Sequence, residues 1–272
     1  LLGGFGVQWI DFPAGATRAE IDATLVHAEA MGRIAMIYLE SPANPTNVLV
    51  DIEAVAAARD ALKGQDTPPI VIDNTFLGPL WQKPLAHGAD IVVYSLTKYA
   101  GGHSELVAGG ALGSLAHMNA IRAVRNTIGT ILDPNSAWML LRSLETLELR
   151  MTRAGENAAR ICAWLKGQSK VEKVVYLGFP DTDRQADIYN RHCSGAGSTF
   201  SLYLRGGEAE AFRFLDALRI DVEPKPKGMW RTTVLFLTAF LFLFPAFGDG
   251  PREMLLGLAA GGLVILSAWL TR

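Results

Sequence analysis

The chain has 272 residues, of which 50% are hydrophobic and 19% are charged, so it can bury a sizeable core as one large domain or two small ones. Its formal net charge of −2 gives no electrostatic basis for binding nucleic acid. The two cysteines, Cys162 and Cys193, form no CxxC pair, and the five histidines show no HxxxH spacing. The scarcity of cysteines and the absence of these pairs argue against a disulfide scaffold or a zinc site. Two unpaired cysteines also indicate a reducing, cytoplasmic compartment.

The first half of the chain alternates between helical and strand-like segments. Apolar residues recur on one side of residues 17–31, and Thr17 and Glu20 at the start could form a capping box. Continuous apolar runs, typical of strands buried on both faces, lie at 34–39, 70–72 and 91–94. Helical segments follow at 52–62 and 80–87, and 109–113 could be a further strand or turn. This order predicts an α/β fold with a mostly parallel sheet flanked by helices.

Polar residues follow each of the three buried strands. Residues 40–44, Asp73 with Asn74, and residues 95–98 stand where the strands end. The carboxyl ends of parallel strands meet at one edge of a sheet, and ligands collect at that edge. The sequence therefore predicts one ligand site built from all three strand ends.

Lys98 is the candidate for covalent chemistry at this edge. It lies just past the strand at 91–94, where burial can lower the pKa of the ε-amine and leave it able to attack a carbonyl. Ser95 and Thr97 add hydroxyls that could hold a phosphate. A lysine beside phosphate-binding hydroxyls is what a pyridoxal-phosphate site requires. For this short motif alone, the alternative is a surface lysine after an edge strand.

The second half of the chain is predicted to form a smaller α+β region. A long helical pattern runs from residue 135 to residue 164, and its mixed charges suit a solvated or ion-paired face. Strands are expected at 171–176 and 198–204, followed by a helix at 208–218.

The C-terminal segment changes in character after a linker at residues 223–231. Residues 232–248 and 254–270 carry no charged side chain, and each run has about 17 residues, close to the ~20 that span a bilayer. Basic residues flank the pair of runs. By the positive-inside rule this predicts a helical hairpin at 232–272 that inserts into a membrane with both ends cytoplasmic. A buried pair of helices is the alternative.

Four longer stretches carry a resemblance to a known family. They are YLESPANPT at residues 38–46, VIDNTF at 71–76, VVYSLTKYAGGHSELVAGG at 92–110 and RNTIGTILDPNSAWMLLRSLETLELRM at 125–151. These stretches resemble the Cys/Met-metabolism enzymes that depend on pyridoxal phosphate (PLP), the family of the cystathionine γ-synthases and γ-lyases. The resemblance runs from about residue 10 to residue 218. It implies a PLP-dependent transferase-like fold of fold type I.

The resemblance implies a role for each polar residue at the strand ends. Lys98 corresponds to the Schiff-base lysine, which also moves protons between substrate carbons. Asp73 would pair with the protonated pyridine nitrogen, Ser95 and Thr97 would bind the phosphate, and Asn44 would lie near the 3-oxygen of the cofactor. Taken alone, Asp73 could instead cap a helix, and Asn44 could brace the Asn-Pro turn.

Four further residues in the matched stretches are expected to support the site. Glu40 and His103 would assist the residues that touch the cofactor. Arg142 and Arg150 would form ion pairs along the helix that carries them.

Compared with the family, the chain is expected to be truncated at both ends, since it opens on Leu1 without an initiating Met and no longer matches from residue 220 onward. Residues 1–134 would form a truncated PLP-binding domain and residues 135–222 a partial C-terminal domain. The implied activity is elimination or replacement at the γ-carbon of a sulfur amino acid or an activated homoserine, in a homo-oligomer, with no metal. A catalytically inactive relict and a membrane-anchored cytosolic binding domain are the alternatives.

Overall fold

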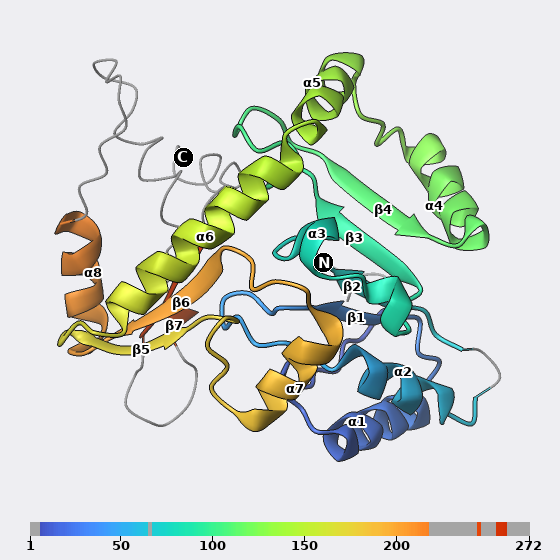
Figure 1. Cartoon of the computed structure of the whole chain (residues 1–272). Helices are drawn as coiled ribbons and strands as arrows, with labels where there is room; N and C mark the ends of the chain where they lie inside the picture. The colour runs from blue at the N-terminus through green and yellow to red at the C-terminus, as the bar shows by residue number, and fades with distance from the viewer. Residues whose placement is uncertain (1–5, 65–66, 218–243, 246–253, 260–272) are drawn as a thin grey trace.

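The computed structural model describes residues 6–64, 67–217, 244–245 and 254–259, which contain two sheets surrounded by helices (Figure 1). The first sheet has the order β1-β2-β3-β4, with strands Ile37–Glu40, Ile70–Asp73, Ile91–Ser95 and Gly109–Gly113. β1, β2 and β3 are parallel, and β4 is antiparallel to β3. The predicted α/β fold with a mostly parallel sheet is confirmed.

Two helices cover one face of this sheet. α1 (Arg18–Met31) and α2 (Ile52–Asp60) share a core with β1 and β2, formed by Ile21, Leu25, Ile37, Leu39, Ile52, Val55, Ile70 and Ile72. The predicted capping box is present at the start of α1: Thr17 Oγ1 accepts the N–H of Glu20, and the Glu20 carboxylate accepts the N–H of Thr17. Local sequence signals therefore place the helix start, and the apolar residues on one face of β1 and β2 form the core with the two helices.

The helices after β2 and β4 differ from the sequence predictions, because the segment after β2 is divided in two and the helix after β4 was not predicted. α3 (Gly78–Trp81) and the 3₁₀ helix η2 (Pro84–His87) replace one predicted segment, and α4 (Leu115–Ile128) follows β4. The single helix predicted at 135–164 is two helices, α5 (Pro134–Leu144) and α6 (Leu147–Leu165). The break falls at Thr146, whose backbone is not helical (φ −109°, ψ 8°). Its hydroxyl donates to the carbonyl of Ser143, and such side-chain bonds compete with the helical ladder.

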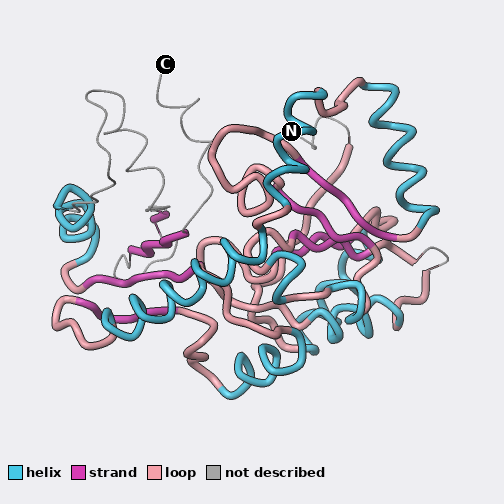
Figure 2. Tube along the Cα trace, turned by 45° about the horizontal axis from the view of Figure 1, so that its top comes forward, coloured by secondary structure: helices cyan, strands magenta, loops and turns pink. Residues whose placement is uncertain are grey.

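The second sheet is antiparallel throughout and has the order β5-β6-β8-β7. Its strands are Val171–Val175, Thr199–Leu204, Met254–Ala259 and Phe244–Pro245. α7 (Asp183–His192) lies between β5 and β6 in sequence, and α8 (Gly207–Ala217) follows β6. α6 packs on β5 and β6 through Ala158, Cys162 and Leu165. Figure 2 shows the strands gathered in two groups, with α6 running alongside the second.

Most of the predicted membrane hairpin at 232–272 lies outside the described residues. Its described part contradicts a helix, because residues 254–259 form β8 and pair with β6 from Thr199–Ala259 to Tyr203–Leu255. The backbone N–H and C=O groups of an apolar segment can form their hydrogen bonds with a neighbouring strand as well as within a helix. Apolar composition alone therefore does not distinguish a strand from a helix here. Among the helices in the described part of the chain, none is long and apolar enough to cross a membrane.

Asn47 joins the loop after β1 to the second sheet. Its side chain is only 2% exposed. The Nδ2 group donates to the carbonyl of Thr199 at 3.0 Å, and Oδ1 accepts the Thr199 hydroxyl at 3.1 Å. Its φ of 57° is a left-handed conformation that Asn adopts more readily than most residues. The two sheets are thus linked through the same loop that carries Asn44.

Candidate active site at the strand ends

The register of the parallel strands places polar side chains on one face of the first sheet. Glu40 is paired with Asp73, and Asp73 is paired with Val93. Ser95 lies two residues beyond Val93, so its side chain points to the same face. α1 and α2 pack against the alternate positions, which include Ile72. The strand ends therefore present their polar groups on the face that those two helices leave open.

Asp73 has a hydrogen-bond donor at each carboxylate oxygen. Oδ1 accepts the N–H of Thr75 at 2.9 Å, and Oδ2 accepts the hydroxyl of Tyr38 at 3.4 Å. Partial burial and the carboxylates of Asp73 and Glu40 raise the pKa of Tyr38 to about 12, so this phenol stays protonated. Sequence reasoning missed Tyr38, although its position two residues before Glu40 on a strand puts both on one face.

Lys98 lies in the turn that follows β3. Its N–H donates to the carbonyl of Ser95 at 3.1 Å, and its own carbonyl accepts the N–H of Gly102 at 2.7 Å. The residue is half-buried, and burial lowers the pKa of its ε-amine, which is the direction predicted from its position. A lowered pKa increases the neutral fraction of the amine, the form that attacks carbonyl carbons.

Ser95 and Thr97 use their hydroxyls differently. The N–H of Ser95 donates to Thr75 Oγ1 at 2.8 Å, whereas its own hydroxyl makes no hydrogen bond to another residue that the structure describes. Thr97 is 3% exposed, and its hydroxyl donates to the Ala108 carbonyl at 3.3 Å and accepts the Ala108 N–H at 3.0 Å. Thr97 thus closes the base of the loop between β3 and β4. Its predicted role at a phosphate would require its hydroxyl to leave the Ala108 carbonyl.

Arg150 of α6 holds the same loop from another side. Its guanidinium donates to the carbonyls of Tyr99 at 2.6 Å and Ser143 at 2.8 Å. The guanidinium of Arg142 lies 5.7 Å from the ring centre of Trp138. Neither arginine makes an ion pair with a described residue, so the prediction of ion pairs along the helix is wrong. Arg150 forms no ion pair because its guanidinium faces peptide carbonyls and not acidic side chains.

Gly102 is needed for this contact. Its φ is +72°, and a Cβ at this position would lie 1.9 Å from Arg150 Nη1. A Cβ on the neighbouring Gly101 would lie 2.9 Å from the carbonyl oxygen of Leu96. The two glycines therefore allow close packing of the loop that carries Lys98.

Asn44 and His103 lie on loops beside the strand ends. Asn44 is exposed, and its N–H donates to Glu40 Oε2 at 3.0 Å. Glu40 thus holds the loop that carries Asn44. The Nδ1 atom of His103 lies 2.7 Å from the carbonyl oxygen of Gly101 and 3.3 Å from the hydroxyl oxygen of Ser143. His103 therefore links the loop to α5.

Replacing Arg150 tests whether the loop depends on it. Arg150→Ala should lower the free energy of unfolding by about 2 kcal/mol, because it removes charge-assisted hydrogen bonds to half-buried carbonyls. Trypsin should also cut faster after Lys98, since the loop is released from α6. Arg153→Ala is the matched control, because Arg153 lies on the same helix with a side chain that is 71% exposed. Equal stability and equal cleavage in the two variants would contradict this role for Arg150.

Comparison with known proteins identifies the family. The sequence model of the Cys/Met metabolism PLP-dependent enzymes matches residues 15–234. The chain is 34% identical over 233 residues to O-succinylhomoserine sulfhydrylase of Pseudomonas aeruginosa, covering 85% of this chain and 54% of that protein. It is 37% identical over 223 residues to L-methionine gamma-lyase of Pseudomonas deceptionensis, covering 80% and 53%. With cystathionine gamma-lyase of Sus scrofa it shares 34% identity, covering 72% and 48%.

Solved structures share the fold. The crystal structure of metB from Corynebacterium glutamicum superposes with a TM-score of 0.75 at 25% identity, covering 99% of this chain and 68% of that one. The structure of cystathionine gamma-lyase from Lactobacillus plantarum, complexed with L-serine, superposes with a TM-score of 0.74 at 28% identity. The match covers 99% of this chain and 69% of that one. The chain spans about half the length of the curated relatives it matches. With this fold and these matches, the chain belongs to the Cys/Met metabolism PLP-dependent enzyme family.

Proposed function

We propose that this chain carries the PLP site of an enzyme that eliminates or replaces a group at the γ-carbon of a sulfur amino acid or an activated homoserine. The observation that carries the proposal is the half-buried Lys98, whose amine has a pKa lowered by burial. It stands at the edge where the ends of β1, β2 and β3 converge. A larger neutral fraction of this amine favours its bond to the aldehyde of the cofactor.

The donor set at the strand ends fits PLP. Lys98 would hold the aldehyde carbon, Asp73 the pyridine nitrogen, Ser95 and Thr97 the phosphate, and Asn44 the 3-oxygen. A carboxylate suits a cationic ring nitrogen, and the Ser95 hydroxyl can donate to a phosphate oxygen. Bound there, PLP would supply an electron sink for negative charge that develops on substrate carbons.

The residues of the chain would orient groups and move protons in this site. The Thr75 N–H and the Tyr38 hydroxyl each donate to one oxygen of Asp73, so the orientation of its carboxylate is fixed. Lys98 would take a proton from one substrate carbon and return it to another. Arg150, through the carbonyl of Tyr99, keeps the loop of Lys98 in place during these transfers.

The substrate class follows from what the names of the relatives have in common. They name O-succinylhomoserine, methionine and cystathionine. All three are homoserine-derived amino acids with a leaving group on the γ-carbon. A small amino acid of this kind is therefore the proposed substrate.

Turnover of these three compounds tests the activity. The full chain supplied with PLP should release a 2-oxo acid from at least one of them. Lys98→Ala should reduce the rate by about 10³-fold, because it removes the group that transfers protons. Lys170→Ala is the matched control, with a side chain that is 80% exposed, and should keep the full rate. A folded chain that binds PLP but converts none of the three would contradict the activity and indicate a catalytically inactive relict.

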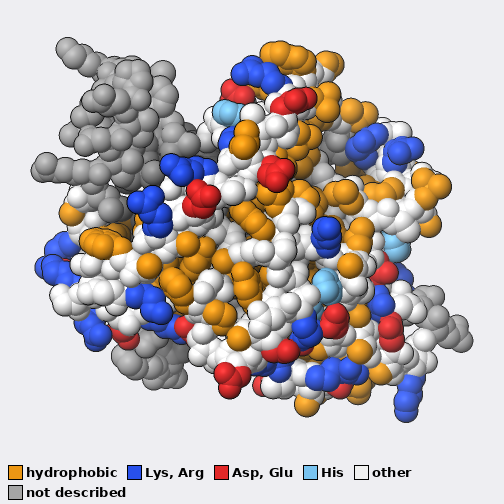
Figure 3. All heavy atoms as spheres, viewed as in Figure 1, with side chains coloured by type: hydrophobic (Ala, Val, Ile, Leu, Met, Phe, Trp, Pro, Cys, Tyr) orange, Lys and Arg blue, Asp and Glu red, His pale blue; other side chains and the backbone are white. Residues whose placement is uncertain are grey.

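We also propose that the chain assembles with copies of itself. None of the residues of α4 is buried, and its Leu115 and Ile128 are 73% and 65% exposed. α5 exposes Trp138 and Leu141, and Figure 3 shows apolar side chains gathered over this end of the molecule. Apolar surface of this extent is typical of an interface.

Light scattering tests assembly of the purified full chain. A dimer or a tetramer is expected, because pairing would remove the apolar faces of α4 and α5 from water. Leu141→Glu should shift the population towards monomer, whereas Val26→Glu on the exposed side of α1 should not. A monomer at every concentration would contradict the assembly.

A further inference from the structure

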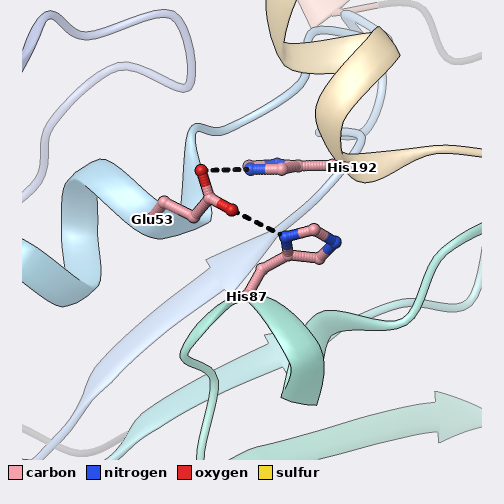
Figure 4. Close-up of side chains that lie close together, drawn as sticks. All are labelled: Glu53, His87 and His192. Atoms are coloured by element: carbon pink, nitrogen blue, oxygen red, sulfur yellow. Dashed lines mark hydrogen bonds and ion pairs between the residues drawn. The ribbon is translucent and has the colours of Figure 1, made fainter.

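Three side chains away from the strand-end residues meet where α2, η2 and α7 come together (Figure 4). Glu53 lies in the first turn of α2, His87 ends η2 and His192 ends α7. Glu53 Oε1 lies 2.9 Å from His87 Nδ1, and Glu53 Oε2 lies 3.8 Å from His192 Nε2. One possible ligand atom from each residue lies within 4.8 Å of the other two.

We propose that this cluster binds a divalent transition-metal ion, Zn²⁺ in particular. Two imidazole nitrogens and a carboxylate oxygen form a donor set that Zn²⁺ accepts. Bonds of about 2.0–2.1 Å place the ligand atoms of a tetrahedral ion about 3.4 Å apart. The cluster is therefore close to the geometry that the ion needs. The Glu53 side chain is 47% exposed, so water can reach the fourth position.

The hydrogen bond inside the cluster joins two of the proposed ligand atoms. Glu53 Oε1 and His87 Nδ1 lie 2.9 Å apart, so one proton lies between them. An ion that binds both atoms has to displace that proton.

Arg191 competes with a metal ion for the same atoms. Its guanidinium donates to the Glu53 carboxylate, and its Nη1 lies 3.1 Å from His192 Nε2. A guanidinium cannot accept a hydrogen bond, so His192 Nε2 is the acceptor and its lone pair points into the cluster. Arg191 also pairs with Asp51 at 2.9 Å and Asp187 at 3.0 Å. Because the guanidinium is a rigid plane, its Nη1 leaves Glu53 and His192 only if the whole group moves. The three carboxylates around this one arginine leave a net negative charge that favours a cation.

A bound ion would link α7 to α2 and η2. These elements come from distant parts of the sequence, so the ion would tie the region after α6 to the helices around the first sheet. The neighbouring Cys193 is not part of the cluster, since its sulfur lies 3.7 Å from Gln82 Nε2. None of the three proposed ligands belongs to the strand-end site, so binding would act on stability.

Zinc titration of the full chain, stripped with a chelator and then loaded with PLP, tests the site. One Zn²⁺ per chain should bind and raise the melting temperature, and Co²⁺ should give the visible absorption of a four-coordinate site. His87→Ala should weaken binding by at least about 100-fold, since loss of an outer-shell partner alone costs 10- to 100-fold. His27→Ala, at an exposed position on α1, should leave binding unchanged.

Arg191→Gln gives the sharper test, because it removes the competing cation without removing a ligand. It should tighten zinc binding by about tenfold or more. Circular dichroism verifies that each variant is folded. If His87→Ala does not fold, Glu53→Gln is used in its place. No stoichiometric binding in either the parent chain or Arg191→Gln would overturn the proposal. So would zinc binding that survives both His87→Ala and Glu53→Gln.

Discussion

The parallel register of β1, β2 and β3 is the constraint on which the proposed active site depends. Glu40 stands opposite Asp73, and Asp73 stands opposite Val93. A slip of one residue in either pairing would turn a carboxylate onto the face that α1 and α2 cover. Ile72 and Leu39, at the alternate positions, would lose their core contacts in the same slip. The apolar core and the polar strand ends are therefore set by the same alternation of side chains.

The loop after β3 is held mainly through its backbone. Thr97 bonds both peptide groups of Ala108 at the base of the loop, and Arg150 reaches the carbonyl of Tyr99. Gly102 leaves the space that the guanidinium occupies. A lysine on such a loop is kept partly out of water, which lowers the pKa of its amine. The packing of this loop and the reactivity proposed for Lys98 thus have one physical origin.

What could be predicted from the sequence depended on the range of the interaction. Local signals sufficed for the capping box of Thr17 with Glu20 and for the apolar runs that form β1, β2 and β3. Contacts between distant segments were missed, because no periodicity encodes them. Arg150 meets a carbonyl 51 residues away, and His87 and His192 reach Glu53 from other helices. Residues 254–259 form a strand because β6 offers them an edge, which their apolar composition does not reveal.

Borohydride reduction of the chain after PLP addition, followed by peptide mass mapping, tests the central claim most directly. The account predicts one stable adduct on the peptide that contains Lys98, because its amine is the one held at the converging strand ends with a lowered pKa. The adduct should be absent from Lys98→Ala and reduced in Asp73→Ala. Label spread over exposed lysines such as Lys166 and Lys170, or no label in a folded sample, would contradict the account.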